Sequence, residues 1–458
     1  MSLEAGINLD SNNPIVSTQS LCPICFNKLD AEIISREAGY YMVKRCPEHG
    51  TFQTLVWNGS TPMEQWIGKD ERTPIRNPQI ASEKGCPYDC GLCGEHRQHT
   101  CTALIEVTQN CNLHCDFCFA GSGAHRSRDP SIEQINRLYE FTMEASGGCN
   151  VQLSGGEPTL RDDLPQIIRN GKDIGFRFIQ VNTNGIRLSK DETYVKELQA
   201  AGLDSVFLQF DGTSDGIYKK LRGRELLEEK TRAIENCGKY GIGVVLVPTL
   251  VPGINTENIG EIISFGLHHI SAVRGVHFQP VSYFGRVPKP PKDKDRLTLA
   301  QLMDEIEKQT NGNIKAIDLK PNQCENSLCS FHGNFLSLGD GQLMAVSKNS
   351  GCCKSKESAR KAKTYVSRNW TGRLTVTGKG SSSDKKSDWD AILDRIHSTS
   401  FSISAMAFQD VWNIDLNRVK DCCIHVVSPD KRLIPFCLYN ITDSEGKALY
   451  RDGSRWSE

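Results

Sequence analysis

Short apolar runs alternate with amphipathic segments through the middle of the chain. Six runs are typical of strands: TALIEVT (102–108), NVQLSGG (150–156), FRFIQVNTNG (176–185), DSVFLQFDG (204–212), GIGVVLVPTLV (241–251) and AVRGVHFQPV (272–281). Between them, stretches such as SIEQINRLYEFTMEA and DETYVKELQAAG carry apolar residues at helical spacing and end near a glycine that can close a helix. Alternating strands and helices predict an α/β fold with a parallel sheet, and six units predict a partial (β/α)6 TIM-like barrel over 102–290.

Polar and glycine-rich motifs lie at the ends of these predicted strands. CNLHCDFC (111–118) follows the first strand, SGGEP ends the second, NTNG ends the third and FDG ends the fourth. Parallel barrels carry their chemistry at the carboxyl ends of their strands. We therefore expect the four motifs to meet at one end of the barrel and to form an active site there.

Cysteine usage distinguishes the regions on either side of the predicted barrel. We expect a rubredoxin- or zinc-ribbon-like metal module over 1–75, an auxiliary-cluster segment over 76–101, and a C-terminal auxiliary-cluster and substrate region over 291–458. The chain shows no basic and apolar leader, and no run approaches the ~20 apolar residues of a membrane span. We expect a cytoplasmic protein, whose 19 cysteines indicate metal sites rather than disulfides. Lys plus Arg (54) nearly balance Asp plus Glu (55), so the total charge favours no class of partner.

The first ligand set has the spacing C-x2-C-x20-C-x2-H. It comprises Cys22, Cys25, Cys46 and His49, with a proline beside each pair. Two short turns that each carry two ligands suit a tetrahedral mononuclear metal. Thiolate and imidazole ligands accept both zinc and a rubredoxin-like iron, so the sequence leaves the metal open.

Two further sets predict auxiliary [4Fe–4S] clusters. The first is C-x3-C-x2-C-x7-C, formed by Cys86, Cys90, Cys93 and Cys101, with a structural role for Cys101 as the alternative. The second is drawn from the C-terminal region, and our first choice of ligands is Cys324, Cys329, Cys422 and Cys437. The choice within the Cys422–Cys423 pair and the place of Cys352 and Cys353 stay open. The isolated Cys149 and Cys237 are interpreted as packing residues.

The CNLHCDFC loop carries Cys111, Cys115 and Cys118 at C-x3-C-x2-C, with no fourth cysteine close behind. Three thiolates can hold three corners of a [4Fe–4S] cluster and leave one iron open, whereas a structural zinc requires a fourth ligand. Together with the later Gly155-Gly156-Glu157, this region resembles the radical S-adenosylmethionine (SAM) superfamily. The resemblance implies that the open iron binds SAM and that reductive cleavage produces a 5′-deoxyadenosyl radical, which takes hydrogen from an unactivated carbon.

The same resemblance implies a set of cofactor-binding residues. Gly155 and Gly156 are expected to let the backbone approach the methionyl ammonium, and Glu157 to offset its charge. Asn182, Asn184 and Asp211 are further candidates, with turn formation as the alternative for each. Arg222 is either a carboxylate- or phosphate-binding residue or a surface arginine.

Longer motifs, including KxCPEHGxF, GCPYDCGLCxEHRQHTC, FQPVSYFGR and IPFCxYN, resemble the group that contains tetraether lipid synthase and dihydropterin dimethyltransferase. That resemblance implies a radical enzyme that forms a C–C bond, either by coupling lipid chains or, as the alternative, by methylating a pterin-like heterocycle. It also implies a reducing donor of the ferredoxin or flavodoxin type. The non-enzyme alternative is an Fe–S electron carrier with a zinc ribbon that binds nucleic acid. The GGEP motif counts against it, and we expect no nucleic-acid partner.

A basic insert, residues 354–386, interrupts the C-terminal region. It holds ten Lys or Arg against two Asp or Glu. Such a segment is most often a solvated insertion. The alternatives are a basic lid over an anionic substrate and a peripheral contact with lipid headgroups at the inner membrane face.

Overall fold

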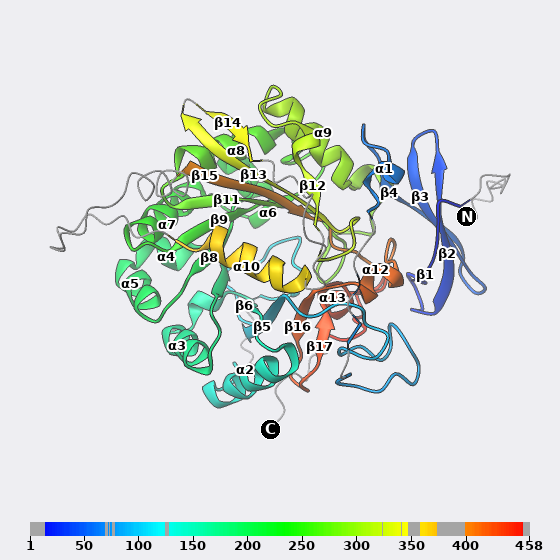
Figure 1. The fold of residues 1–458 in the computed structure, drawn as a ribbon, viewed down its shortest axis with the longest axis horizontal. Coiled ribbons are helices and arrows are strands. Elements are labelled where there is room, and N and C mark those ends of the chain that lie inside the picture. The colour runs from blue at the N-terminus through cyan, green and yellow to red at the C-terminus, as the bar shows by residue number, and fades with distance from the viewer. Residues whose placement is uncertain are drawn as a thin grey trace.

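A small amino-terminal sheet packs beside a large curved sheet that is wrapped by helices (Figure 1). The structure is a computed structural model that describes residues 14–68, 72, 74–75, 78–123, 128–322, 324–339, 341–346, 358–372 and 399–451. The Cys352–Cys353 pair lies outside the described residues. Among the described helices, none is long and apolar enough to cross a membrane.

The amino-terminal sheet is an antiparallel meander in the order β1-β2-β3-β4. Its strands are β1 (Val16–Leu21), β2 (Lys28–Arg36), β3 (Gly39–Cys46) and β4 (Gly50–Trp57), followed by the short helix α1 (Met63–Trp66). Alternate residues of β2 are buried, as expected for a sheet with one solvated face. The predicted ligands lie in the two turns that join β1 to β2 and β3 to β4.

The predicted parallel barrel is confirmed, with strands close to the expected positions. They are β5 (Thr102–Thr108), β6 (Asn150–Gly155), β7 (Ile179–Thr183), β8 (Ser205–Gln209), β9 (Gly243–Val247) and β11 (Val273–Pro280). Each pairs in parallel with the next, and the two-residue β10 (Thr249–Leu250) pairs with β11. Near-continuous burial of β5 and β9 reflects helices on one side and the barrel interior on the other.

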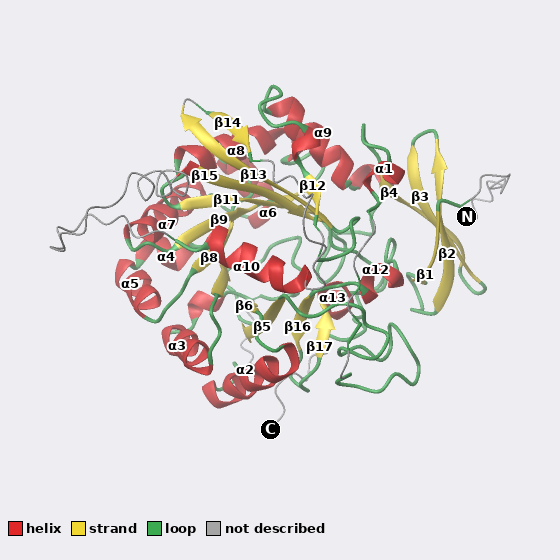
Figure 2. Ribbon diagram, in the orientation of Figure 1, coloured by secondary structure: helices red, strands yellow, loops and turns green. Residues whose placement is uncertain are grey.

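Helices cover the outer face of these strands (Figure 2). They are α2 (Ile132–Ser146), α3 (Leu164–Ile174), α4 (Ile186–Lys190), α5 (Glu192–Ala200), α6 (Asp215–Arg222), α7 (Leu227–Lys239) and α8 (Ile259–His268). α2 begins with a capping box between Ser131 and Gln134, and it ends at Gly147 in the left-handed conformation. These local signals place the helix between β5 and β6.

The C-terminal region extends the same sheet at both edges. At one edge, β15 (Ser400–Met406) pairs in parallel with β11; β13 (Ser330–Gly339), β12 (Lys320–Pro321) and β14 (Gln342–Ala345) follow. At the other edge, β16 (Ile424–Val427) pairs with β5, and β17 (Leu433–Pro435) pairs with β16. The helices α9 (Leu299–Gln309), α12 (Leu416–Lys420) and α13 (Phe436–Asn440) complete this region. The predicted boundary at residue 290 therefore does not separate two sheets, because the strands on both sides of it hydrogen-bond within one.

The basic insert contains a helix that packs on the barrel. α10 (Ser358–Trp370) lies across the front of the large sheet in Figure 1, and Trp370 is buried. The interpretation of 354–386 as a wholly solvated insertion is therefore wrong for this helix, because its apolar residues at helical spacing contact the barrel interior. The rest of the insert lies outside the described residues apart from Thr371 and Gly372.

Candidate active site and metal centres

The loop that carries Cys111, Cys115 and Cys118 leaves the carboxyl end of β5 and is fixed by Arg286. Cys118 N donates to Arg286 O at 3.0 Å, and Arg286 Nε donates to Cys115 O at 2.7 Å. A Cβ on Gly285 would lie 2.5 Å from Cys118 O, so only glycine allows this close approach. All three cysteines line one cavity. Arg286 was not predicted, although it ends the FQPVSYFGR motif.

Burial of the first of these cysteines has a chemical consequence. It raises the pKa of the Cys111 thiol to about 12, and the neighbouring Glu157, Cys115 and Cys118 add to the effect. A thiol with such a pKa is protonated at neutral pH unless a cation binds. Cys111 shares its loop with two further cysteines, and a three-cysteine loop fits a cluster whose iron supplies the compensating charge.

Gly155 and Gly156 bring the end of β6 against this loop. A Cβ on Gly155 would lie 2.0 Å from Thr108 O, and one on Gly156 would lie 2.1 Å from Asn110 O. Gly156 N donates to Thr108 O at 2.8 Å. The two glycines therefore have a packing role within the protein that the sequence did not suggest, and their approach to a methionyl group stays a prediction.

The carboxylate of Glu157 is buried and hydrogen-bonded on both oxygens. Oε1 accepts from Thr159 N at 3.0 Å and from the hydroxyls of Thr159 and Thr183 at 2.6 and 2.7 Å. Oε2 accepts from Asn184 N at 2.7 Å. Glu157 therefore joins the ends of β6 and β7 and positions the NTNG turn, and it also lines the cavity. Its predicted charge interaction with SAM is untested.

The two asparagines of the NTNG turn differ in whether their side-chain oxygens already accept a hydrogen bond. Asn184 Nδ2 donates to Asn112 Oδ1 at 2.7 Å, and its Oδ1 accepts from Ile186 N, so this side chain is engaged in a turn. Asn182 Nδ2 reaches Ser154 Oγ at 3.4 Å, while its buried Oδ1 has no hydrogen-bond partner among the described residues. A buried acceptor that faces the cavity fits a donor on a bound ligand.

Asp211 and Arg222 form a buried ion pair beside the cysteine loop. Arg222 Nε and Nη2 each donate to the Asp211 carboxylate at 2.7 Å. Arg222 is 6% exposed, and it lines the cavity together with Cys115. The surface alternative for Arg222 is therefore wrong. Asp211 is fully buried and accepts hydrogen bonds from Arg222, so it positions Arg222 rather than lining the cavity itself.

The predicted amino-terminal ligand set assembles in the two turns of the small sheet. The thiols of Cys22, Cys25 and Cys46 and a ring nitrogen of His49 all lie within 4.8 Å of one another. Cys46 Sγ is 3.4 Å from His49 Nδ1, and Cys25 Sγ is 4.0 Å from Cys46 Sγ. Metal–sulfur bonds of ~2.3 Å in a tetrahedron separate the ligand atoms by about 3.8 Å, so the site fits a zinc ion.

The remaining cysteines group differently from the prediction. Cys101 lies with Cys324 and Cys423, all three buried and within 4.8 Å of one another, and the Cys101 and Cys423 thiols are 3.0 Å apart. The reason is the sheet: Cys101 precedes β5, Cys423 precedes β16, and these strands pair, so Cys101 N donates to Cys423 O at 2.8 Å. Cys101 therefore does not complete the Cys86 set. We call Cys101, Cys324 and Cys423 the seam group, because they lie where the residues before β5 and β16 meet the loop before β13.

Glu325 stands beside the seam group and was not predicted. Its Oε2 is 3.9 Å from Cys423 Sγ, and Asn322 donates to its Oε1 at 3.2 Å. Burial raises the pKa of this carboxyl to about 7. Three thiolates and a nearby carboxylate fit an auxiliary cluster with one iron that lacks a cysteine.

Cys329, Cys422 and Cys437 form a second set. Burial raises the pKa of the Cys422 thiol, and the charges of Cys437 and Cys329 add to this effect; burial and the charge of Cys329 likewise raise the pKa of Cys437. Arg418 Nη2 lies 3.4 Å from Cys329 Sγ, and Gln409 N lies 3.3 Å from Cys437 Sγ. The predicted C-terminal set is thus divided: Cys324 belongs to the seam group, and both members of the Cys422–Cys423 pair have cysteine neighbours.

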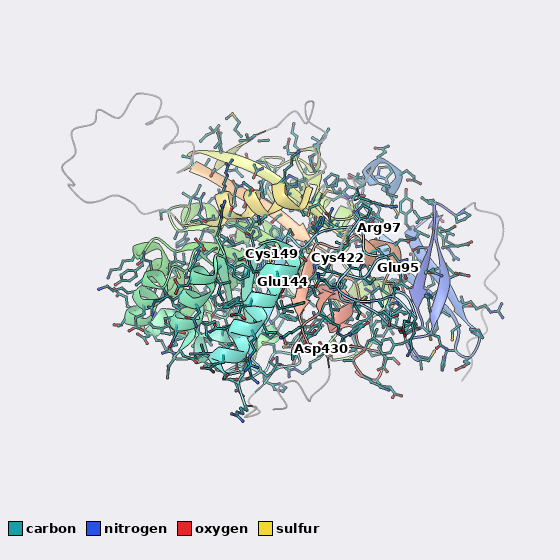
Figure 3. The ribbon with its side chains drawn as sticks, turned by 60° about the horizontal axis from the view of Figure 1, so that its bottom comes forward. Glu95, Arg97, Glu144, Cys149, Cys422 and Asp430 are labelled. Atoms are coloured by element: carbon teal, nitrogen blue, oxygen red, sulfur yellow. The ribbon has the colours of Figure 1, made fainter. Side chains whose placement is uncertain are left out.

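Cys86, Cys90 and Cys93 stay together as predicted, without Cys101. A hydrogen bond from Cys90 lowers the pKa of Cys86, and the Cys86 thiol and burial raise that of Cys90. Their segment meets α12, because Arg97 N donates to Lys420 O at 2.7 Å, and Figure 3 shows Cys422 close to Arg97. His96 is buried and packs rather than ligates, with its Nε2 2.8 Å from Cys422 O.

A single cavity of about 890 Å³ joins the loop that carries Cys111, Cys115 and Cys118 to the seam group. It is lined by residues of both cysteine sets, by barrel-interior side chains such as Phe207 and His277, and by α10. β5 runs between its two ends, and seven residues at ~3.3 Å each span roughly 20 Å. The rest of the wall is rich in apolar side chains, among them Leu104, Leu113, Phe117, Phe119, Val247, Val281, Phe284, Phe331, Met406, Phe408 and Phe436.

Two sequence families match the chain. The model of the Radical SAM superfamily matches residues 105–266, and that of the HMPTM N-terminal zinc ribbon domain matches residues 14–58. These ranges coincide with the cysteine loop and barrel strands and with the four-ligand site. The cluster, SAM and zinc expected from the motifs are therefore those of the matched families.

Known proteins are similar over different shares of the chain. The 7,8-dihydro-6-hydroxymethylpterin dimethyltransferase of Methanocaldococcus jannaschii is 35% identical over 92% of this chain and 93% of its own. A probable GTP 3′,8-cyclase of Methanococcus aeolicus is 29% identical over 41% of this chain and 62% of its own. Among solved structures, Streptococcus suis SuiB bound to precursor peptide SuiA has a TM-score of 0.40 and 17% identity, covering 47% of this chain and 46% of that one.

Proposed function

Because the chain belongs to the radical SAM family of the 7,8-dihydro-6-hydroxymethylpterin dimethyltransferase, we propose that it is a C–C bond-forming enzyme that joins long apolar alkyl or isoprenoid chains. The observation that carries the proposal is the cavity of about 890 Å³ and its mostly apolar wall. Part of this volume belongs to the cluster and SAM. The remainder continues past the barrel interior to the seam group, which suits an elongated substrate better than a flat heterocycle.

The residues of the site have separate tasks in this proposal. Cys111, Cys115 and Cys118 hold the cluster, Asn182 Oδ1 accepts a hydrogen bond from SAM, and Arg222 places positive charge beside the thiolates. When bound, the cluster and SAM supply a 5′-deoxyadenosyl radical. Joining two carbons breaks two C–H bonds and forms one C–C bond, so the reaction consumes two SAM molecules and two electrons from an external donor. The apolar wall excludes water, which protects a carbon radical from side reactions.

The second candidate is methylation of a pterin-like heterocycle, which is favoured by the name of the M. jannaschii relative. A pterin requires polar partners in its pocket. Several polar groups of the barrel interior are already paired with one another: Gln152 Nε2 donates to Gln180 Oε1 at 2.8 Å, and His277 Nδ1 lies 2.8 Å from Ser404 Oγ. This pairing supports the apolar substrate.

The test is substrate-dependent formation of 5′-deoxyadenosine. Anaerobically reconstituted enzyme is reduced, given SAM, and offered either a dialkyl glycerol lipid or a dihydropterin, and 5′-deoxyadenosine is followed by mass spectrometry. We expect the lipid to accelerate its formation and to yield a product joined through two former methyl or methylene carbons. Acceleration by the pterin alone would refute chain coupling. Cys237→Ala, which removes a buried thiol of α7 that does not line the cavity, is the matched control for Cys111→Ala.

A further inference from the structure

The helix α10 closes the barrel at the end opposite to the radical site. The side chain of Asn150, the first residue of β6, donates to Lys363 O at 3.1 Å. Just after the helix, Gly372 N donates at 3.2 Å to the carbonyl oxygen of Asp204, the residue directly before β8. A Cβ on Gly243, the first residue of β9, would lie 2.2 Å from Trp370 O. These contacts are all at the amino ends of the strands. α10 therefore lies across the base of the barrel, whereas Cys111 lies at its top.

The apolar residues on the inward face of α10 are small at one end of the helix and larger at the other. Ala359 and Ala362 pack on the seam group, and Val366 and Trp370 enter the barrel interior. Lys361 and Tyr365 of this helix also line the cavity. The Trp370 ring lies 5.3 Å from that of Phe207 and 5.9 Å from that of His277, between centroids, and its Nε1 donates to Ser402 Oγ at 3.3 Å. Trp370 is 7% exposed and fixed on several sides.

Side chains usually fill the interior of a parallel barrel in layers. Here the cavity passes through the interior, and Val366 and Trp370 line its wall together with Phe207, Val247 and His277. We propose that α10 is the floor of the substrate cavity and that Trp370 sets the greatest chain length that the site accepts. This inference rests on the proposed function, because it concerns how far an apolar chain can extend from the radical site.

The binding affinity of alkyl chains of increasing length tests, without catalysis, whether Trp370 limits the length of the bound chain. The reconstituted holoenzyme is titrated calorimetrically with n-alkyl glycerol monoethers of increasing length, below their micellar concentrations. Each buried methylene contributes about 0.8 kcal/mol, so Kd should fall roughly fourfold per carbon until the chain meets Trp370 and then level off. In Trp370→Ala this break should move to longer chains. Trp370→Phe, which keeps most of the ring volume but loses the bond to Ser402, should keep the break near its original length.

Val366→Phe provides an independent variant that adds volume instead of creating a hole. It should move the break to shorter chains. A break at the same length in wild type, Trp370→Ala and Val366→Phe would overturn the floor while leaving chain coupling intact. A shifted break without any acceleration of 5′-deoxyadenosine formation would support the floor and refute the coupling proposal. Failure of the wild type to bind any alkyl chain would overturn both.

Discussion

The two ends of β5 carry cysteine sites of opposite construction. At the carboxyl end, Cys111, Cys115 and Cys118 lie on one short loop that directly follows the strand, and the GGEP turn ends the next strand of the sheet. At the amino end, Cys101 meets Cys423, which is 322 residues away, and Cys324. The first site depends on local chain geometry, and the second exists only once both edges of the sheet have formed.

This difference explains which predictions were successful. The ribbon ligands were grouped correctly, because each pair lies within one turn and the two turns join successive strands. The sequence predicts Cys101 as a member of the Cys86 set, because it follows Cys93 by only eight residues. Pairing of β16 with β5 overrode that spacing, and no periodicity in the sequence indicates which strand closes an edge.

Glycines show the same limit at the active site. The sequence predicts that Gly155 and Gly156 lie at the end of a strand. It does not predict that a Cβ at these positions would clash with Thr108 O and Asn110 O, at the end of β5. The burial of Arg222 could not be predicted either, because its helix α6 is rich in lysine and such a helix is expected to face solvent. Residue type and motif order could be read from the sequence, whereas the partners across strands required the fold.

The largest expected effect separates the two ends directly. Cys111→Ala should abolish 5′-deoxyadenosine formation, because it removes a ligand of the only cluster that binds SAM in this scheme. Cys324→Ala should leave SAM cleavage in place and remove only the iron held by the seam group, because the seam group lies at the far end of the cavity. Iron content and 5′-deoxyadenosine, followed by mass spectrometry, are measured on the same reconstituted samples. Loss of SAM cleavage in both variants, with the radical-site cluster intact by EPR, would show that the two ends are not separable.

A finer division concerns adjacent residues. Cys423→Ala should lose the same iron and the same EPR signal as Cys101→Ala and Cys324→Ala, because these thiols form one group. Cys422→Ala should instead match Cys329→Ala and Cys437→Ala. Iron content and EPR spectra of these six variants and of Cys86→Ala provide the check. If Cys101→Ala shared its spectrum with Cys86→Ala, Cys101 would belong to the Cys86 set, as the spacing of the sequence predicts.

Breaking the buried ion pair at the carboxyl end should cost more stability than breaking a surface pair. Asp211→Asn leaves the Arg222 charge buried without its partner and should lower the free energy of unfolding by ~3–5 kcal/mol. Asp162→Asn is the matched control. It breaks an Arg187–Asp162 pair of similar length whose carboxylate is 91% exposed, and it should cost no more than ~1 kcal/mol. Urea unfolding of the zinc-loaded protein measures both, and equal losses would contradict the buried role of Asp211.

The smallest expected effect concerns Lys230, whose Nζ donates to Asn184 O beneath the NTNG turn. Burial lowers the pKa of Lys230 to about 8, while the unfolded chain keeps a value near 10.5. Between these values the unfolded state binds more protons, so this group makes the folded state more stable as pH rises from 8 to 10. Lys230→Met lacks this contribution, and the stability of the wild type relative to the variant should rise by about 2 kcal/mol over that interval. Parallel urea titrations of the wild type and the variant at pH 8 and pH 10 test this. Loss of the hydrogen bond to Asn184 lowers the stability of the variant equally at both pH values. A difference in stability that does not change with pH would therefore place the Lys230 pKa near its ordinary value.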